Sequence, residues 1–169
     1  ALTGIAPYGG AWFVESVDRC DTPNDELDAI GEIDLRNVAV VSSSVDGIAD
    51  YYDSEGEIRL VEYAPNRLRY EYTSSAEAMA VFSEVYFPEG WSVTIDGEPA
   101  EYFAADYVLR GMVLPAGEHT VEWSFRAPQW GLISTIMAIC SIAIIVALLA
   151  VIIFRKELTS ESCQIKSKE

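Results

Sequence analysis

Five carboxylates gathered between Asp46 and Glu57 form the densest group of potential ligands in this sequence. Hard cations such as Ca²⁺ take several carboxylate oxygens, and Gly56 would allow a tight loop around one. The spacing of the five residues departs from the EF-hand calcium loop, however. We therefore favour a solvated loop and predict no metal site for this run, which comprises Asp46, Asp50, Asp53, Glu55 and Glu57.

His119 is the only histidine among the 169 residues. No cysteine or second histidine lies near enough in the sequence to suggest a metal site with it. The sequence also contains no Gly-x-Ser-x-Gly elbow, phosphate-binding loop or dinucleotide fingerprint. We therefore predict that His119 lies at a strand edge, and that the chain has no catalytic residue and no cofactor.

Arg110 is the first candidate for a ligand contact, because a guanidinium can make paired hydrogen bonds to a phosphate or carboxylate. In an extended strand its side chain alternates away from those of Leu109 and Gly111. The alternative, which we favour, is a structural ion pair with Glu84 or Glu122.

Aromatic pairs are the second kind of candidate, since a sugar ring presents C–H groups to an aromatic face. Most aromatic side chains in a domain of this size belong to its core. The pairs that we expect at the surface are Tyr51 with Tyr52, and Tyr102 with Phe103. The candidate contacts with an acceptor or glycan are therefore Arg110, Tyr51, Tyr52, Tyr102 and Phe103.

These candidates lie in a region whose pattern indicates strands. Apolar and polar residues alternate in residues 68–72 and 121–125, so each segment should bury one face. We predict a mainly β domain, an antiparallel β-sandwich of about eight strands, because no 12-residue amphipathic helix is available as a parallel crossover. The predicted strands are 38–42, 58–63, 68–72, 79–87, 91–95, 101–103, 107–114 and 121–125, and the first core residues are Leu68, Tyr70, Tyr72, Val121, Trp123 and Phe125.

Two short sequence motifs predict a particular turn and a particular helix start. Asp96-Gly97 predicts a two-residue type I′ hairpin, because both turn positions need positive φ angles. Thr22-Pro23-Asn24-Asp25-Glu26 is a helix-start pattern, and Leu27, Ile30 and Ile33 follow at helical spacing. We therefore predict a short helix in residues 1–35, a lead-in segment before the sandwich at 36–128.

A transmembrane helix is predicted at residues 129–154, because no charged residue occurs there before Arg155-Lys156. All lysines lie in the tail, residues 155–169, which the positive-inside rule places in the cytoplasm. Residues 1–128 then lie outside the cytoplasmic membrane. This part has seven arginines and 24 acidic residues, so we expect the lipid bilayer as a partner and no nucleic acid.

The segments 82–91, 96–97 and 105–123 together resemble the YfhO family of bacterial integral membrane proteins. The resemblance extends to shorter pieces at 11–14 and 26–30, and it covers most of residues 10–154. It implies a polytopic protein related to glycosyltransferases of the C-type fold, which move a sugar from a lipid-linked donor to a cell-envelope acceptor. This chain resembles the C-terminal end of such a protein.

The resemblance carries no catalytic residue onto this chain, because the family's catalytic acidic residue lies in an early loop that has no counterpart here. We therefore expect a non-catalytic accessory region of a bacterial cytoplasmic membrane protein. The remaining transmembrane helices of a longer chain and envelope glycan are its expected partners. The alternative is a membrane-tethered, non-enzymatic surface module that binds glycan or protein.

Overall fold

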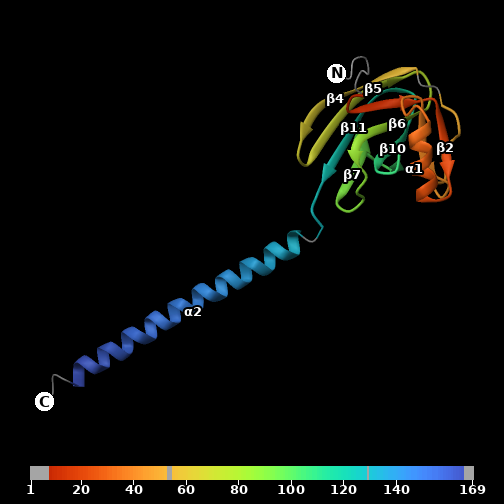
Figure 1. The fold of residues 1–169 in the computed structure, drawn as a ribbon. Coiled ribbons are helices and arrows are strands. Elements are labelled where there is room, and N and C mark those ends of the chain that lie inside the picture. Colours follow the sequence, from red (N-terminus) through yellow and green to blue (C-terminus); the bar gives the residue numbers. More distant parts are fainter. Residues whose placement is uncertain (1–7, 53–54, 129, 166–169) are drawn as a thin grey trace, which may run out of the picture. The chain divides into compact units, whose positions relative to one another are not determined.

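The computed structural model describes residues 8–52, 55–128 and 130–165 (Figure 1). The chain divides into two compact units, Ala1–Arg126, here called the head, and Ala127–Glu169. The head is built from strands with one short helix, and the second unit is one long apolar helix. The predicted fold class, a mainly β head followed by one C-terminal helix, is confirmed.

Two antiparallel sheets form the body of the head (Figure 1). The first sheet has the order β1 (Ala11–Val14), β6 (Ala78–Val85), β10 (Leu109–Leu114) and β9 (Phe103–Ala105). The second has the order β4 (Gly56–Ala64), β5 (Arg67–Ser74), β11 (Gly117–Phe125), β7 (Trp91–Ile95) and β8 (Glu98–Ala100). Because β1 pairs with β6, the segment set apart as a lead-in contributes an edge strand to the sandwich.

The main core lies between these sheets. Trp123 is fully buried, and the rings of Phe82 and Tyr102 meet it edge-on at centroid distances of 5.4 and 4.8 Å. Alternation along β5 and β11 explains this core, because every second side chain turns inward. Of the predicted core residues, five are buried and Phe125 is half-buried against Trp91.

A third layer covers the other face of the first sheet. It consists of β2 (Ser16–Cys20) and β3 (Val38–Ser42), which pair in parallel, and of α1 (Pro23–Glu32), which connects them. Thr22 caps α1 in a reciprocal capping box with Asp25, which confirms the predicted helix start. The sandwich itself is antiparallel, as predicted, but this parallel pair was not foreseen, because a ten-residue helix suffices for its crossover. The side chains that this layer buries include Val17, Ala39 and Val41.

Most predicted strands occur, but one was misplaced. Asp96 and Gly97 have φ angles of 51° and 88°, as the type I′ hairpin requires. A two-residue turn lets the next strand start at once, so β8 begins at Glu98. The predicted strand at 101–103 is therefore wrong: residues 101 and 102 connect β8 to β9, and only Phe103 belongs to a strand. Eleven strands are present in the described residues, against about eight predicted.

Asp106 joins the third layer to the first sheet. Its backbone N–H donates to Val40 O at 2.7 Å, and its Oδ1 accepts from Val40 N–H at 2.8 Å. Its Oδ2 is buried without a hydrogen-bond partner. Burial raises the pKa of the Asp106 carboxyl to about 6, although the bond from Val40 opposes the shift.

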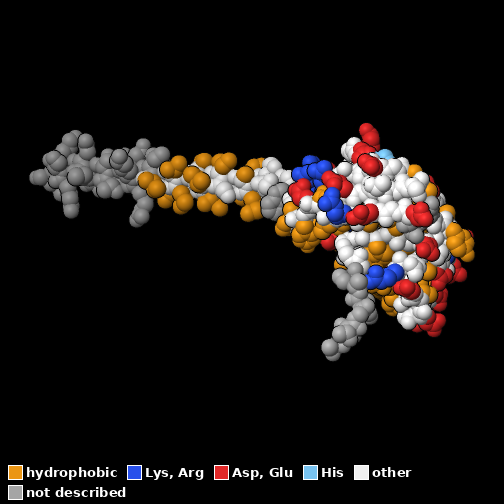
Figure 2. Space-filling view, turned by 90° about the horizontal axis from the view of Figure 1, so that it is seen from above, with side chains coloured by type: hydrophobic (Ala, Val, Ile, Leu, Met, Phe, Trp, Pro, Cys, Tyr) orange, Lys and Arg blue, Asp and Glu red, His pale blue; other side chains and the backbone are white. Residues whose placement is uncertain are grey.

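The second unit consists of α2 (Trp130–Ile165). Its segment Gly131–Ile152 is 22 residues of mean hydropathy 3.0, long and apolar enough to cross a bilayer. At a rise of about 1.5 Å per residue this segment measures about 33 Å, close to the thickness of a hydrocarbon core. Figure 2 shows hydrophobic side chains along this helix and acidic side chains spread over the head. The side chains of residues 153–169 lie outside those that the structure describes.

Candidate functional site

An open groove lies on the second sheet, and most of its lining comes from the outer face of that sheet. Along β4, β5 and β11 every second side chain turns away from the core, and those positions are mostly polar. The groove has a volume of about 540 Å³. Its lining residues are Glu57, Arg59, Glu71, Tyr72, Thr73, Asp96, Glu118, His119 and Thr120.

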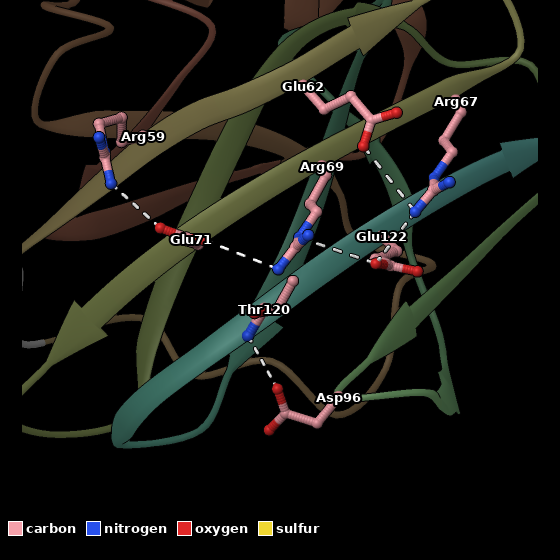
Figure 3. Close-up of polar contacts among 8 residues, drawn as sticks. All are labelled: Arg59, Glu62, Arg67, Arg69, Glu71, Asp96, Thr120 and Glu122. Atoms are coloured by element: carbon pink, nitrogen blue, oxygen red, sulfur yellow. Dashed lines mark hydrogen bonds and ion pairs between the residues drawn. The ribbon is translucent and has the colours of Figure 1, made fainter.

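A chain of alternating charges begins in the groove, at Arg59 and Glu71, and continues across this face (Figure 3). The Glu71 carboxylate forms ion pairs with Arg59, at an N–O distance of 3.0 Å, and with Arg69, at 3.7 Å. The Glu122 carboxylate lies 3.8 Å from the Arg69 guanidinium and 3.6 Å from that of Arg67. Arg67 also pairs with Glu62, the last member of the chain, at 3.8 Å. Every member is at least 39% exposed, so each pair contributes only about 0–1 kcal/mol. Side chains held so weakly can exchange one partner for a ligand at little cost.

His119 and Asp96 close one side of the groove. The His119 Nδ1 lies 2.6 Å from Asp96 Oδ2, and its Nε2 lies 3.1 Å from Ala116 O. Asp96 Oδ1 accepts from the Thr120 N–H at 2.8 Å. The hydrogen bond to Asp96 raises the pKa of His119, and the same bond lowers the pKa of Asp96. Both shifts favour the charged pair, so the groove gains a positive charge in mildly acidic conditions.

We predict that the ring signals of His119 titrate above the ordinary midpoint of about 6.5. The stabilisation from this shift is complete below that value and disappears as the pH rises through the raised pKa. Because His119 is the only histidine, its NMR signal needs no assignment strategy. Asp96→Asn should lower the midpoint, whereas Asp46→Asn, an exposed change away from the groove, should not. An unchanged midpoint in Asp96→Asn would contradict the pairing.

Arg110 lies in the core and not on the surface. Its side chain is sandwiched between two indole rings, 4.3 Å from the centroid of Trp91 and 4.7 Å from that of Trp123. Nε donates to Val85 O at 2.9 Å, and Nη1 is buried without a partner. Among the described residues no carboxylate forms an ion pair with Arg110, and Glu122 pairs with Arg67 and Arg69 instead. Cation–π stacking takes the place of the expected ion pair.

The predicted aromatic contacts are dispersed. Tyr51 is 82% exposed, whereas the hydroxyl of its neighbour Tyr52 accepts a hydrogen bond from Ala49 N–H. Tyr102 packs against Trp123 in the main core. The ring of Phe103 lies over Gly111, where an added Cβ would come within 2.5 Å of it. The structure therefore does not bring Arg110, Tyr51, Tyr52, Tyr102 and Phe103 into one site, and their role as contacts stays a prediction.

Glu57 and His119 were considered from the sequence only as possible metal ligands, and the other groove residues were not recognised as site candidates. For most of them the signal was the polar half of an alternating strand, as in Glu57 with Arg59 and Glu71 with Thr73, whereas Tyr72 and His119 have the parity of the core residues. That half is also what any solvent-facing sheet presents, so alternation alone does not distinguish a groove from an ordinary surface.

The acidic run between Asp46 and Glu57 does not gather into a ligand set. Asp50 forms an ion pair with Arg19 at 3.1 Å, and Glu57 belongs to the groove. Asp53 lies outside the described residues. No group of three potential metal ligands occurs in the part of the chain that the structure describes.

Comparison with known proteins adds no relative: no family model matches the chain, and neither a curated protein nor a solved structure is significantly similar to it.

Proposed function

We propose that this chain is the membrane-anchored accessory region of a glycosyltransferase-like membrane protein, and that its groove binds the sugar acceptor. The groove carries the proposal, because carboxylates, a guanidinium and hydroxyls converge there on the face of a rigid sheet. Sugar hydroxyls both donate and accept, so they suit such a mixed surface. The head would then hold an acceptor close to the membrane, while catalysis takes place in a different part of the protein.

The charge of the groove narrows the class of sugar. Four carboxylates line it, Glu57, Glu71, Asp96 and Glu118, against Arg59 and a His119 that is charged only when protonated. A phosphorylated or carboxylated glycan would be repelled by this excess of negative charge. We therefore propose a neutral or amino-substituted sugar as the ligand.

The proposed orientation places the head outside a bacterial cytoplasmic membrane and the C-terminal tail in the cytoplasm. The positive-inside rule supports this orientation, because the residues that follow the apolar segment include Arg155 and Lys156, whereas the head has no lysine. Envelope glycan is accessible only on the outer side. The orientation and the ligand class therefore support each other.

Binding of oligosaccharides by the full chain in nanodiscs tests the groove. Neutral N-acetylglucosamine oligomers should bind, and phosphorylated oligosaccharides of the same length should not. Glu57→Gln should weaken binding about tenfold or more, because a hydrogen bond to a charged group contributes about 1.5–3 kcal/mol. The matched control is Glu32→Gln, an exposed change on α1 in the third layer. Equal affinity in both variants would contradict the proposal.

A second candidate function is a non-enzymatic surface module that binds protein or glycan. The predominance of acidic residues on the head supports it, since such a surface suits a basic partner. The gene's upstream sequence discriminates between the two. About ten further apolar spans with an acidic residue in the first outer loop support the accessory region, and a cleavable signal peptide joined to Ala1 supports the module.

A further inference from the structure

Exposed apolar side chains gather at one end of the first sheet, where β6 ends and β10 begins. Val85 and Phe87 are 62% and 50% exposed, and Tyr107 and Val108 are exposed as well. Val85 pairs with Leu109, and Tyr86 N–H donates to Val108 O at 2.7 Å. The four side chains therefore lie at the same end of the sheet. We call Val85, Phe87, Tyr107 and Val108 the apolar rim.

The turn that carries Tyr107 and Val108 has a strained backbone conformation. Asp106 and Tyr107 have φ angles of 49° and 69°, in the left-handed region that residues other than glycine seldom adopt. The Val108 N–H donates to Asp106 O at 2.8 Å, which tightens the turn. Asp106 is held by Val40, and the turn leaves Tyr107 and Val108 partly exposed to solvent, at 43% and 45%. A strained turn with exposed apolar side chains suggests a function beyond folding.

The chain leaves the head at this same end. Phe125, the last residue of β11, pairs with Trp91, and Arg126 N–H donates to Gly90 O at 2.7 Å. Gly90 is three residues from Phe87 along the β6–β7 connection. Only residues 127–129 separate Arg126 from the start of α2. Four peptide units extend at most about 14 Å, so covalent geometry alone limits how far this end can lie from the start of the apolar helix.

The second sheet contributes membrane-compatible side chains at this end too. The β4–β5 hairpin lies beside the end of β11, because Phe125 N–H donates to Asn66 O at 2.9 Å. It carries Tyr63, which is 69% exposed, and Arg67, which pairs with Ser124 in the ladder. Tyrosine is typical of the boundary between lipid and water, and arginine can extend its charged head into the headgroups.

We propose that the apolar rim docks on the lipid surface, with Val85, Phe87, Tyr107 and Val108 entering the boundary between headgroups and acyl chains. The occupant is the bilayer because α2 carries a membrane-crossing segment and the tether is too short to take this end far from it. The exposed Glu89 beside the rim favours zwitterionic over anionic lipid. Docking would fix the height of the head above the membrane. The inference depends only on the membrane crossing within the proposed function, not on sugar binding.

Lipid-dependent quenching in the full chain tests this inference. The chain, with Cys20, Cys140 and Cys163 each replaced by serine, is reconstituted in phosphatidylcholine nanodiscs. It carries an environment-sensitive fluorophore at either Tyr107→Cys or Tyr51→Cys. Tyr51 is also an exposed tyrosine, but it lies away from the apolar rim. It forms a β-bridge with Ser16, close to Val14 at the end of β1, and Val14 pairs with Met79 at the opposite end of β6. Lipids with a doxyl group near the headgroup should quench the Tyr107 label at least threefold more than the Tyr51 label.

Variants of the apolar rim and a second quencher complete the test. Val85→Ser with Phe87→Ser should remove most of the quenching at the Tyr107 label, while Val61→Ser, an exposed valine on β4, should not. Equal quenching at both labels would overturn docking. A Tyr107 label shielded from aqueous iodide but not quenched by lipid would also overturn it and indicate a protein partner. Failure of the chain to enter nanodiscs would refute both docking and the membrane crossing, whereas absent sugar binding alone would leave docking intact.

Discussion

Trp123→Ala is expected to destabilise the head by about 3–5 kcal/mol, which is a large part of the stability of an ordinary domain. Trp123 is fully buried between the two sheets, and its ring contacts Phe82, Tyr102 and Arg110. Alanine would leave a cavity that a rigid sandwich cannot close, and Arg110 would lose one of its two stacking partners. Urea unfolding followed by circular dichroism measures the loss.

Trp123→Phe separates packing from polarity at the same position. The indole Nε1 is buried without a hydrogen-bond partner, so phenylalanine removes an unsatisfied donor while it keeps most of the ring. We expect this variant to lose less than about 1.5 kcal/mol. Tyr51→Ala, a change at a highly exposed ring, should cost almost nothing. A loss below about 1 kcal/mol in Trp123→Ala would contradict the packing of the core.

Asp106→Asn is expected to change how the stability of the head depends on pH. In the native head the pKa of Asp106 is about 6, against 3.8 for the free side chain. A carboxyl with a raised pKa stabilises the fold below the unfolded value, and this contribution disappears as the pH rises through about 6. The free energy of unfolding of the native chain should therefore fall by about 1–3 kcal/mol between pH 4 and pH 7.5, relative to the variant.

The asparagine variant retains the geometry that Asp106 provides. Its amide oxygen can still accept from Val40 N–H, so the link between β3 and the turn after β9 is preserved. Asp46→Asn removes a carboxylate from the surface, and a general effect of net charge would appear in both variants. Parallel stability curves for the native chain and Asp106→Asn would show that the buried carboxyl does not titrate as described.

Local signals predicted much of the head. Alternation placed Leu68, Tyr70 and Trp123 in the core, and Asp96-Gly97 gave both the type of its turn and the hairpin between β7 and β8. Of the third layer, α1 and β3 were predicted, but β2 was missed because it is short and pairs in parallel with a strand that lies beyond a helix. No local pattern distinguishes such a strand from a loop.

Arg110 illustrates how a pattern can be read too locally. Its alternation with Leu109 and Gly111 did not show which of the two faces of the strand is buried. Arg110 has the same parity as Met112 and Leu114, which face the main core, so its side chain points inward as well. The register between β10 and β6 shifts between Leu109 and Arg110, which removes the regular alternation at that end. The burial of Arg110 between two indoles depends on Trp91 and Trp123, which come from two other strands and are not adjacent in the sequence.

The groove could not be predicted for a related reason. Its lining comes from three strands and from the turn that holds Asp96, and only pairing of β11 with β5 brings His119 and Thr120 beside Glu71. Apart from Tyr72, which is buried in the core, each of these side chains taken alone is an ordinary surface residue. Their convergence is a property of the sheet.

Labelling of single cysteines in intact cells tests the central claim, that a membrane-crossing helix holds the β head outside the cytoplasm. A membrane-impermeant maleimide is applied to cells that produce the chain with Cys20→Ser. We expect labelling of Asp46→Cys, an exposed position of the head, in intact cells, and labelling of Cys163 in the tail only after permeabilisation. Labelling of Cys163 but not of Asp46→Cys in intact cells, or recovery of the chain in the soluble fraction, would contradict the account.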